Sequence, residues 1–144
     1  MIVYFDASAL VKLALADEPG RAAVVDLLDV ASIPATARVT YPECHAALAA
    51  AARAGRLTET QLAQCVRVIQ AVDDGLTSVA IDQTVAREAG ALAEAHRLRG
   101  YDAVHLAAAL TLHTPHRPVL FASWDKRLHA AASAAGLTAV PHAL

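Results

Sequence analysis

The 144-residue sequence lacks several features that mark secreted or membrane proteins. Its two cysteines, Cys44 and Cys65, lie far apart in helical patterns, which favours reduced core thiols over a disulfide framework. The helical stretch without charged residues, 103–116, is shorter than the ~20 residues of a membrane span. Asp6 interrupts the apolar start and no basic region precedes it, so a signal peptide does not fit. We therefore expect a cytoplasmic protein without a membrane partner.

An excess of positive charge is missing as well. The net charge is −2 and the pI about 6.4, so no basic field indicates a nucleic-acid partner. Lysine is scarce, and most of the 12 basic residues are arginine, the better bidentate phosphate ligand. A GC-biased genome gives the same arginine bias, so this composition does not identify a ligand.

What the sequence does contain is an alternation of short apolar runs and helical patterns. Five runs read as strands: 2–5, 32–37, 76–81, 119–122 and a weak edge strand at 137–140. The helices between them predict a three-layer α/β/α sandwich with a mostly parallel central sheet of four to five strands. We expect a single domain spanning residues 1–144.

Two capping boxes mark helix starts in the middle of the chain. Thr40 with Glu43, and Thr58 with Gln61, have the Thr-x-x-Glu/Gln form of this motif. The first is expected to open an alanine-rich helix that stops at Gly55, and the second a helix to about residue 72. Together they predict an antiparallel helical hairpin.

The apolar run at residues 2–5 ends in a carboxylate, and a helix follows at once. Open α/β sheets bind ligands just outside the carboxyl ends of their strands, so Asp6 is a candidate site residue. The alternative is that Asp6 or Ser8 only caps the helix. This stretch does not distinguish the two.

Three further acids share the context of Asp6. Glu43, Asp102 and Asp125 also lie in the first turns of predicted helices. In a parallel sheet the N-termini of the crossover helices lie at the strands' carboxyl edge, so the four acids could meet there. The alternative is that all are caps or first-turn acids, each stabilising its helix by about 1 kcal/mol. That alternative is strongest for Glu43, which completes a capping box.

A cluster of these acids would need a counter-charge. Two unit charges about 5 Å apart repel by roughly 3 kcal/mol at an effective dielectric constant of 20. Helix N-termini offset only about 0.3–1 kcal/mol each, which leaves a divalent cation or a shared proton to supply the rest. An all-oxygen ligand set favours Mg²⁺ or Mn²⁺ over Zn²⁺.

Four motifs together resemble the PIN-domain family, and most closely the toxins of bacterial VapBC toxin–antitoxin pairs. They are the run 4–12 (YFDASALVK), Glu43 heading an alanine-rich helix, the run 99–107 (RGYDAVHLA) and the run 123–128 (SWDKRL). The resemblance implies that Asp6, Glu43, Asp102 and Asp125 are the metal-binding, catalytic acids of a ribonuclease. It also implies that Ser8 and Ser123 are the accompanying hydroxyls. Pro42, just before Glu43, departs from the pattern in a minor way.

Several residues near the acids remain open. His105 could contact a ligand, although a hydrogen-bonded packing role is the commoner one for such a residue, and Trp124 could stack a base but is better explained by packing. The basic side chains closest in sequence to the acids are candidates for phosphate contacts: Lys12, Arg99, Lys126 and Arg127.

These observations predict a Mg²⁺/Mn²⁺-dependent endoribonuclease in which metal-activated water hydrolyses RNA phosphodiester bonds. We expect a homodimer restrained by a VapB-type antitoxin, which would lay an apolar helix or strand beside the Glu43 helix pair and point an Arg or Lys toward Asp6 and Asp102. One alternative is a haloacid-dehalogenase-like phosphatase with Asp6 as nucleophile, although Ser8 stands where that chemistry needs a second acid. Another is a binding module whose acids only cap helices.

Overall fold

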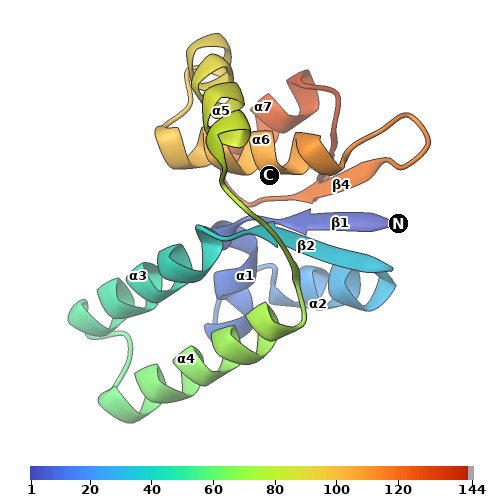
Figure 1. The fold of residues 1–144 in the computed structure, drawn as a ribbon. Coiled ribbons are helices and arrows are strands. Elements are labelled where there is room, and N and C mark those ends of the chain that lie inside the picture. The colour runs from blue at the N-terminus through green and yellow to red at the C-terminus, as the bar shows by residue number, and fades with distance from the viewer. Residues whose placement is uncertain (143–144) are drawn as a thin grey trace.

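The central sheet of the computed structural model, which describes residues 1–142, consists of five parallel strands in the order β3-β2-β1-β4-β5 (Figure 1). The strands are β1 (Ile2–Phe5), β2 (Ile33–Ala37), β3 (Thr77–Val79), β4 (Val119–Ala122) and β5 (Thr138–Val140). The expected sheet of four to five strands therefore has five, and every pairing is parallel.

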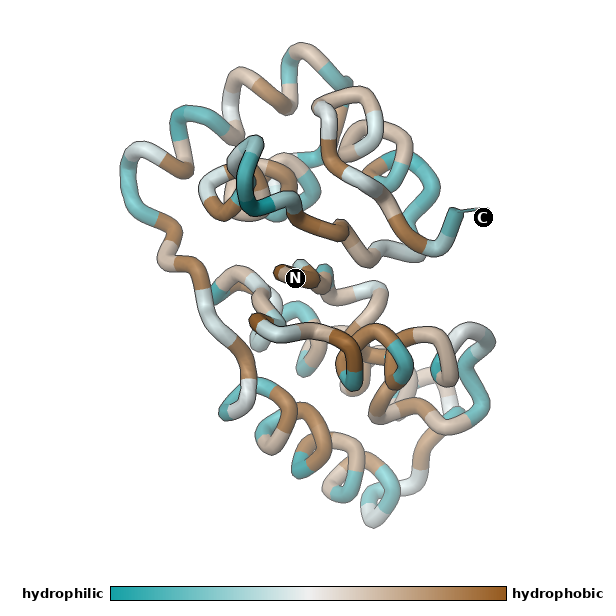
Figure 2. Tube along the Cα trace, turned by 90° about the vertical axis from the view of Figure 1, so that its right-hand side faces the viewer, coloured by the Kyte–Doolittle hydropathy of each residue, from teal (hydrophilic) through white to brown (hydrophobic). Residues whose placement is uncertain are grey.

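Helices cover both faces of this sheet (Figures 1 and 2). One layer contains α1 (Ala7–Ala14), α2 (Arg21–Val30), α3 (Thr40–Arg53) and α4 (Glu59–Asp74). The other contains α5 (Gln83–His96), α6 (Gly100–Leu112) and α7 (Lys126–Ala134). The predicted three-layer α/β/α fold is confirmed.

The central position of β1 explains its unbroken apolar sequence. Successive side chains of a strand point to opposite faces, so Tyr4 enters the core beneath α5–α7 while Phe5 enters the core beneath α1–α4. Both are 0% exposed. The Tyr4 ring stacks on that of Phe121 from β4, with centroids 5.3 Å apart. Strand β1 is thereby buried on both faces, and the position of its last residue is fixed.

The start of α3 differs from the expectation. Val39 is the N-cap, no side chain caps the helix, and Thr40 is already its first residue. The Thr40 hydroxyl is buried and lies 2.7 Å from the hydroxyl of Thr36 on β2, so it ties α3 to the sheet. The prediction of a Thr40–Glu43 capping box was therefore wrong. Pro42 lies in the first turn of α3, where a missing N–H breaks no helical hydrogen bond.

The second capping box is present. The Thr58 hydroxyl accepts from the Gln61 N–H at 3.1 Å, and the Gln61 side chain accepts from the Thr58 N–H at 2.9 Å. Helices α3 and α4 pack side by side as the predicted hairpin (Figure 1). Strand β3 is shorter than the predicted 76–81, as befits an edge strand. Within the described residues no helix has the length and apolarity needed to cross a membrane.

Candidate active site

Asp6 directly follows β1 and is the N-cap of α1. Its Oδ1 accepts from the Ala9 N–H at 2.9 Å and from the Ser8 hydroxyl at 2.7 Å, while Oδ2 accepts from the Ser123 hydroxyl at 2.6 Å. The residue is only 3% exposed. Asp6 is thus an N-cap, but capping uses only Oδ1. Its Oδ2 accepts from Ser123, which is 117 residues away in the sequence.

The two serines join the ends of β1 and β4. The Ser8 hydroxyl accepts from the Trp124 N–H at 2.8 Å, and the Ser123 hydroxyl accepts from the Asp125 N–H at 3.1 Å. Their oxygens are 3.5 Å apart. Both hydroxyls predicted to accompany the acids therefore contact Asp6, and they fix its carboxylate in one orientation.

Burial raises the pKa of Asp6 above its ordinary value. The neighbouring His105 and the hydrogen bonds from Ser123, Ser8 and the Ala9 N–H oppose that increase without cancelling it. The ionised carboxylate therefore lacks a full counter-charge in the protein.

Asp102 and Asp125 lie near Asp6 on the same edge of the sheet. Asp125 is the N-cap of α7, and its Oδ1 accepts from the Arg127 and Leu128 N–H groups, each at 2.9 Å. Asp102 lies in the first turn of α6. Burial raises the pKa of Asp102, and the negative charges of Asp125 and Asp6 raise it further, against the opposing charges of Arg99 and His105. Three of the four predicted acids are thus electrostatic neighbours.

Glu43 is held by a histidine. Nε2 of His105 lies 3.2 Å from Oε1 and 3.1 Å from Oε2 of Glu43, and Nδ1 lies 2.9 Å from the Tyr4 hydroxyl. Burial raises the pKa of Tyr4 well above 10, so the hydroxyl keeps its proton. It can donate that proton to Nδ1, which leaves Nε2–H facing Glu43. His105 is therefore a buried, hydrogen-bonded residue that acts on an acid of the site.

The acids do not converge tightly in this conformation. No group of three or more His, Cys, Asp or Glu side chains in residues 1–142 lies close enough to hold a metal ion. The reason is that the Asp6 oxygens accept from the serines, Glu43 faces His105, and Asp125 caps its own helix. The chemistry of the donors, carboxylates with neighbouring hydroxyls, fits a hard cation such as Mg²⁺ or Mn²⁺.

The four candidate phosphate ligands differ in their availability. Lys12 is 8% exposed, with Nζ 3.5 Å from Glu18 and 5.4 Å from the centroid of the Trp124 ring, so its charge is already engaged. The Arg127 guanidinium donates to the Arg97 carbonyl, and Lys126 is on the exposed surface. Arg99 lines a cavity with Glu43 and Asp102 and is the best placed of the four.

Trp124 has a packing role. Gly20 has a φ of +89°, and a Cβ there would lie 2.6 Å from Nε1 of Trp124. The indole thus lies directly on the backbone that precedes α2.

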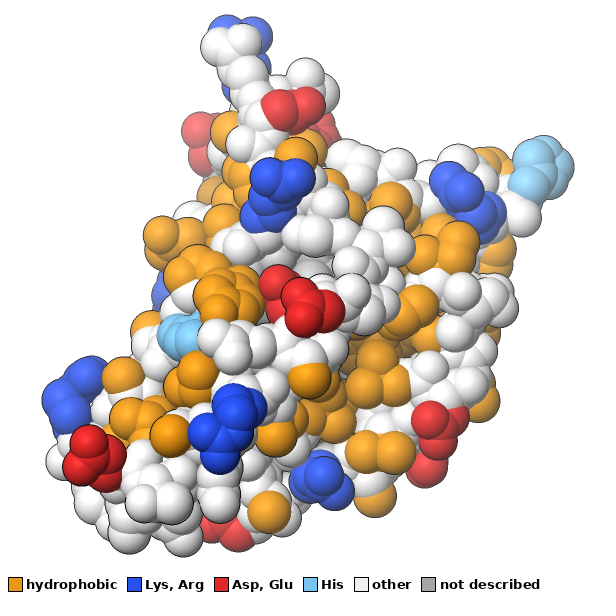
Figure 3. All heavy atoms as spheres, turned by 60° about the horizontal axis from the view of Figure 1, so that its bottom comes forward, with side chains coloured by type: hydrophobic (Ala, Val, Ile, Leu, Met, Phe, Trp, Pro, Cys, Tyr) orange, Lys and Arg blue, Asp and Glu red, His pale blue; other side chains and the backbone are white. Residues whose placement is uncertain are grey.

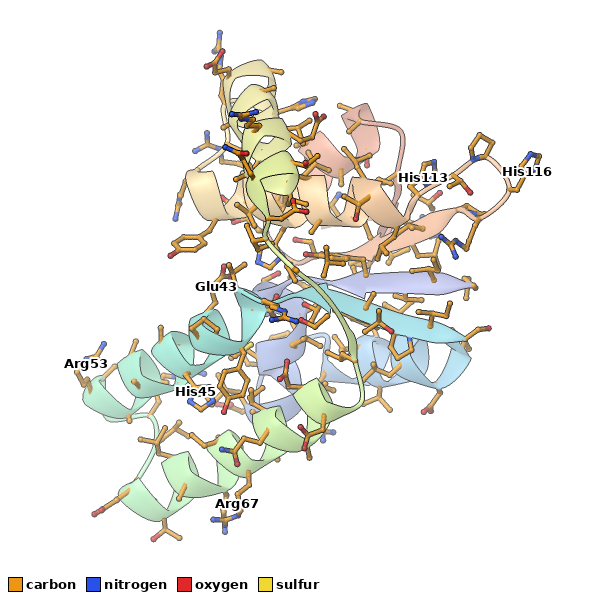
Figure 4. All side chains as sticks on the ribbon, viewed as in Figure 1. Glu43, His45, Arg53, Arg67, His113 and His116 are labelled. Carbon is orange, nitrogen blue, oxygen red and sulfur yellow. The ribbon has the colours of Figure 1, made fainter. Side chains whose placement is uncertain are left out.

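His113 and His116 lie in the loop between α6 and β4, far from Glu43 (Figure 4). No local pattern predicts the contact between His105 and Glu43, since 62 residues separate them.

Comparison with known proteins shows the family to which this chain belongs. A family model described as the PIN domain matches residues 3–134. Two relatives from Mycobacterium tuberculosis strains, named Ribonuclease VapC45 and Ribonuclease VapC49, are each 46% identical over 140 residues, which is 97% of this chain and 95% of each relative. The chain therefore belongs to the PIN-domain family, and its group within that family is VapC.

Solved structures agree on the fold. A crystal structure of PAE2754 from Pyrobaculum aerophilum has a TM-score of 0.67 at 23% identity and covers 91% of this chain and 79% of that one. A toxin–antitoxin complex from Klebsiella pneumoniae has a TM-score of 0.55 at 19% identity, and the match covers 82% of this chain and 83% of that one. VapBC2 from Rickettsia felis, bound to a promoter DNA fragment, has a TM-score of 0.58 at 10% identity, and the match covers 83% of this chain and 86% of that one.

Proposed function

We propose that this chain is a Mg²⁺- or Mn²⁺-dependent endoribonuclease and the toxin of a toxin–antitoxin pair. The observation that carries the proposal is the grouping of carboxylates at the carboxyl edge of the sheet: burial raises the pKa of Asp6, and burial together with the negative charges of Asp125 and Asp6 raises the pKa of Asp102. Relatives at 46% identity bear the name ribonuclease, which supports the choice of RNA as substrate. A bound divalent ion would lower the pKa of water and neutralise charge on the scissile phosphate.

The residues of the chain have separate tasks in this scheme. Asp6, Glu43, Asp102 and Asp125 would hold the ion. Ser8 and Ser123 keep both oxygens of Asp6 in place, and the N-terminus of α7 orients Asp125. Arg99, whose charge opposes that of Asp102, can attract a phosphate to the same edge.

Cleavage of RNA by the purified chain tests the proposal. Activity should disappear with EDTA and return with Mg²⁺ or Mn²⁺. Asp102→Asn should lower the rate about 100-fold or more, since it removes a charged ligand. Asp82→Asn is the matched control, because Asp82 only caps α5 and Asn caps equally well. Cleavage that persists in chelator would overturn the mechanism.

The alternative phosphatase is disfavoured by the residue two positions after Asp6. That chemistry needs a second acid there, whereas Ser8 occupies the position and donates its hydroxyl hydrogen to Oδ1 of Asp6. The binding-module alternative predicts no turnover at all. Assays of p-nitrophenyl phosphate and of RNA, run on the same preparation, distinguish the three functions.

The proposed partner is a VapB-type antitoxin. A cavity of about 520 Å³ lies between α1, α4 and the connection between α3 and α4. Leu13, Leu57 and Val68 line it together with polar residues, among them Asp17, Arg56 and Gln61. On the face formed by these helices, hydrophobic side chains lie among scattered charges of both signs (Figure 3). Such a surface suits an apolar helix or strand, whose Arg could pair with the acids of the site.

Growth experiments test the partner. Expression of the chain alone should arrest growth, and co-expression of an adjacent small antitoxin gene should relieve the arrest. Harmless expression of the folded wild-type chain would contradict the proposal. We also propose a homodimer, which light scattering after gel filtration will detect as twice the 15.0 kDa chain mass.

A further inference from the structure

A cavity of about 780 Å³ opens between α5 and α6, next to the acids. Helix α5 lies across α6 at this point (Figure 1). Small or apolar residues form one part of its wall, among them Ala89, Gly90, Ala93 and Val104. Glu43, Arg99 and Asp102 form the polar part, and Tyr101 completes it. One cavity thus joins an apolar compartment to the proposed cleavage site.

Gly90 is not required by the packing of α5. It lies in the interior of the helix, its φ is not in the left-handed region, and a Cβ there would have no heavy atom within 4 Å. Glycine destabilises a helix interior relative to alanine, and here no close approach of another element explains it. The lack of a side chain at Gly90 leaves free space in the cavity.

The side chain of Tyr101 is unusually exposed for a large aromatic residue. It is 64% exposed, the highest value among the exposed large hydrophobic side chains of the described chain. Its ring makes no aromatic pair within residues 1–142, unlike Tyr4 and Tyr41. Arg99 next to it has no carboxylate within ion-pair distance in the same residues. An aromatic face and a cation are thus both available at the rim of the cavity.

We propose that this cavity binds one unpaired nucleobase of the RNA substrate, next to the bond that is cut. The inference rests on the proposed ribonuclease function and adds to it a base-binding subsite between α5 and α6. The base would lie against Tyr101 in the apolar compartment, and its phosphate would face Arg99 and the acids. The wall offers few groups that could read base edges, so this subsite selects for an unpaired base more than for its identity.

The chemistry of the lining favours a nucleotide over a protein helix as occupant. A nucleotide is itself divided into an apolar, stackable base and an anionic phosphate, which matches the two parts of the cavity. An apolar helix of a second copy would bury the charges of Arg99 and Asp102 without partners, which is unfavourable. A nucleotide therefore matches both parts of the cavity, whereas an apolar helix matches only the apolar part.

Abasic substitution tests the inference on the wild-type enzyme. The substrate is a single-stranded RNA cut at one bond, with one base removed at a time along the strand. For the wild type, loss of the base that occupies the cavity should raise KM about tenfold or more, at one position adjoining the cleaved bond. In Tyr101→Ala the same removal should have little further effect, and Tyr101→Phe should behave like the wild type. Equal abasic effects in the wild type and Tyr101→Ala would overturn the inference.

Filling the cavity provides a second, independent measurement. Gly90→Leu should raise KM about tenfold, whereas Ala91→Leu, which adds the same side chain to an exposed position of α5 outside the cavity, should not. A shift in oligomeric state in Gly90→Leu with KM unchanged would assign the cavity to a second copy and overturn the proposal. Failure of the wild type to cleave any RNA would instead refute the proposed function.

Discussion

The imidazole of His105 joins the carboxylate of Glu43 to the interior of the protein, with Nε2 at 3.1 Å from Oε2 and the residue only 1% exposed. Its other nitrogen contacts the buried hydroxyl of Tyr4. One acid of the site is therefore oriented by a hydrogen-bond chain that begins in the core, and a change in that chain should affect both stability and function.

Substitution of His105 tests this chain. His105→Ala leaves the Tyr4 hydroxyl without its acceptor and opens a cavity, so the free energy of unfolding should fall by about 2–4 kcal/mol. His105→Gln, which can still donate to Glu43, should lose less and keep more RNA cleavage. Urea denaturation measures the difference. His116→Ala, at an exposed position of the loop between α6 and β4, is the control, and an equal loss in that variant would contradict the assigned role.

The raised pKa of Asp6 predicts a pH-dependent effect of Asp6→Asn. Because the native pKa lies above the unfolded one, this group's contribution to stability is present below the unfolded pKa of about 3.9 and is lost as pH rises through the native pKa. Metal-free Asp6→Asn should therefore melt higher than the wild type at pH 7, with the difference shrinking toward pH 4. Asp82→Asn should show no such trend in calorimetry.

Metal binding should be visible without any substrate. A cation that relieves the repulsion among Asp6, Asp102 and Asp125 binds the folded state alone, so Mn²⁺ at 100 times its Kd would stabilise it by about 2.7 kcal/mol. That corresponds to a rise in Tm of about 5–10 °C for a chain of this size. Asp102→Asn should reduce the rise by more than half. An identical rise in both proteins would argue against Asp102 as a ligand.

The cysteines should be unreactive in the native protein. Burial, with the nearby charges of Glu43, Asp6 and Asp73, raises the pKa of Cys44 to about 12, and burial also raises that of Cys65. Because the thiolate is the reactive species, Ellman's reagent at pH 8 should label neither thiol until the protein is unfolded. Rapid labelling of native Cys44 would contradict its buried position on α3.

Two glycines should respond to alanine in opposite directions. Gly20→Ala forces a side chain into a backbone with φ of +89° and onto the Trp124 ring, and should destabilise the protein by about 1–3 kcal/mol. Gly90→Ala enters open space in a helix and should stabilise it by about 1 kcal/mol. Thermal melts of both variants provide the comparison. A loss of stability in Gly90→Ala would mean that the α5–α6 cavity is closed in solution.

Local patterns in the sequence were sufficient for the elements themselves. The apolar run 2–5 could only be a strand buried on both faces, and the turn into α1 after Asp6 follows from a cap that acts within three residues. The box at Thr58 formed because both its partners are in the same helical turn. A parallel sheet followed from the alternation of strands with helices.

Which side chains meet depends on contacts between elements that are distant in the sequence. Thr40 carries the same local signature as Thr58, yet its hydroxyl is directed to Thr36 because β2 brings a buried partner within 2.7 Å. Ser123 reaches Asp6 across 117 residues, since β4 pairs with β1. Contacts of this kind depend on strand order and on where each helix packs, which no pattern within a few residues can encode. Local sequence therefore specifies the acids and the helices that carry them, whereas the packing of those helices on the sheet sets the orientation of the acids and forms the cavity beside them.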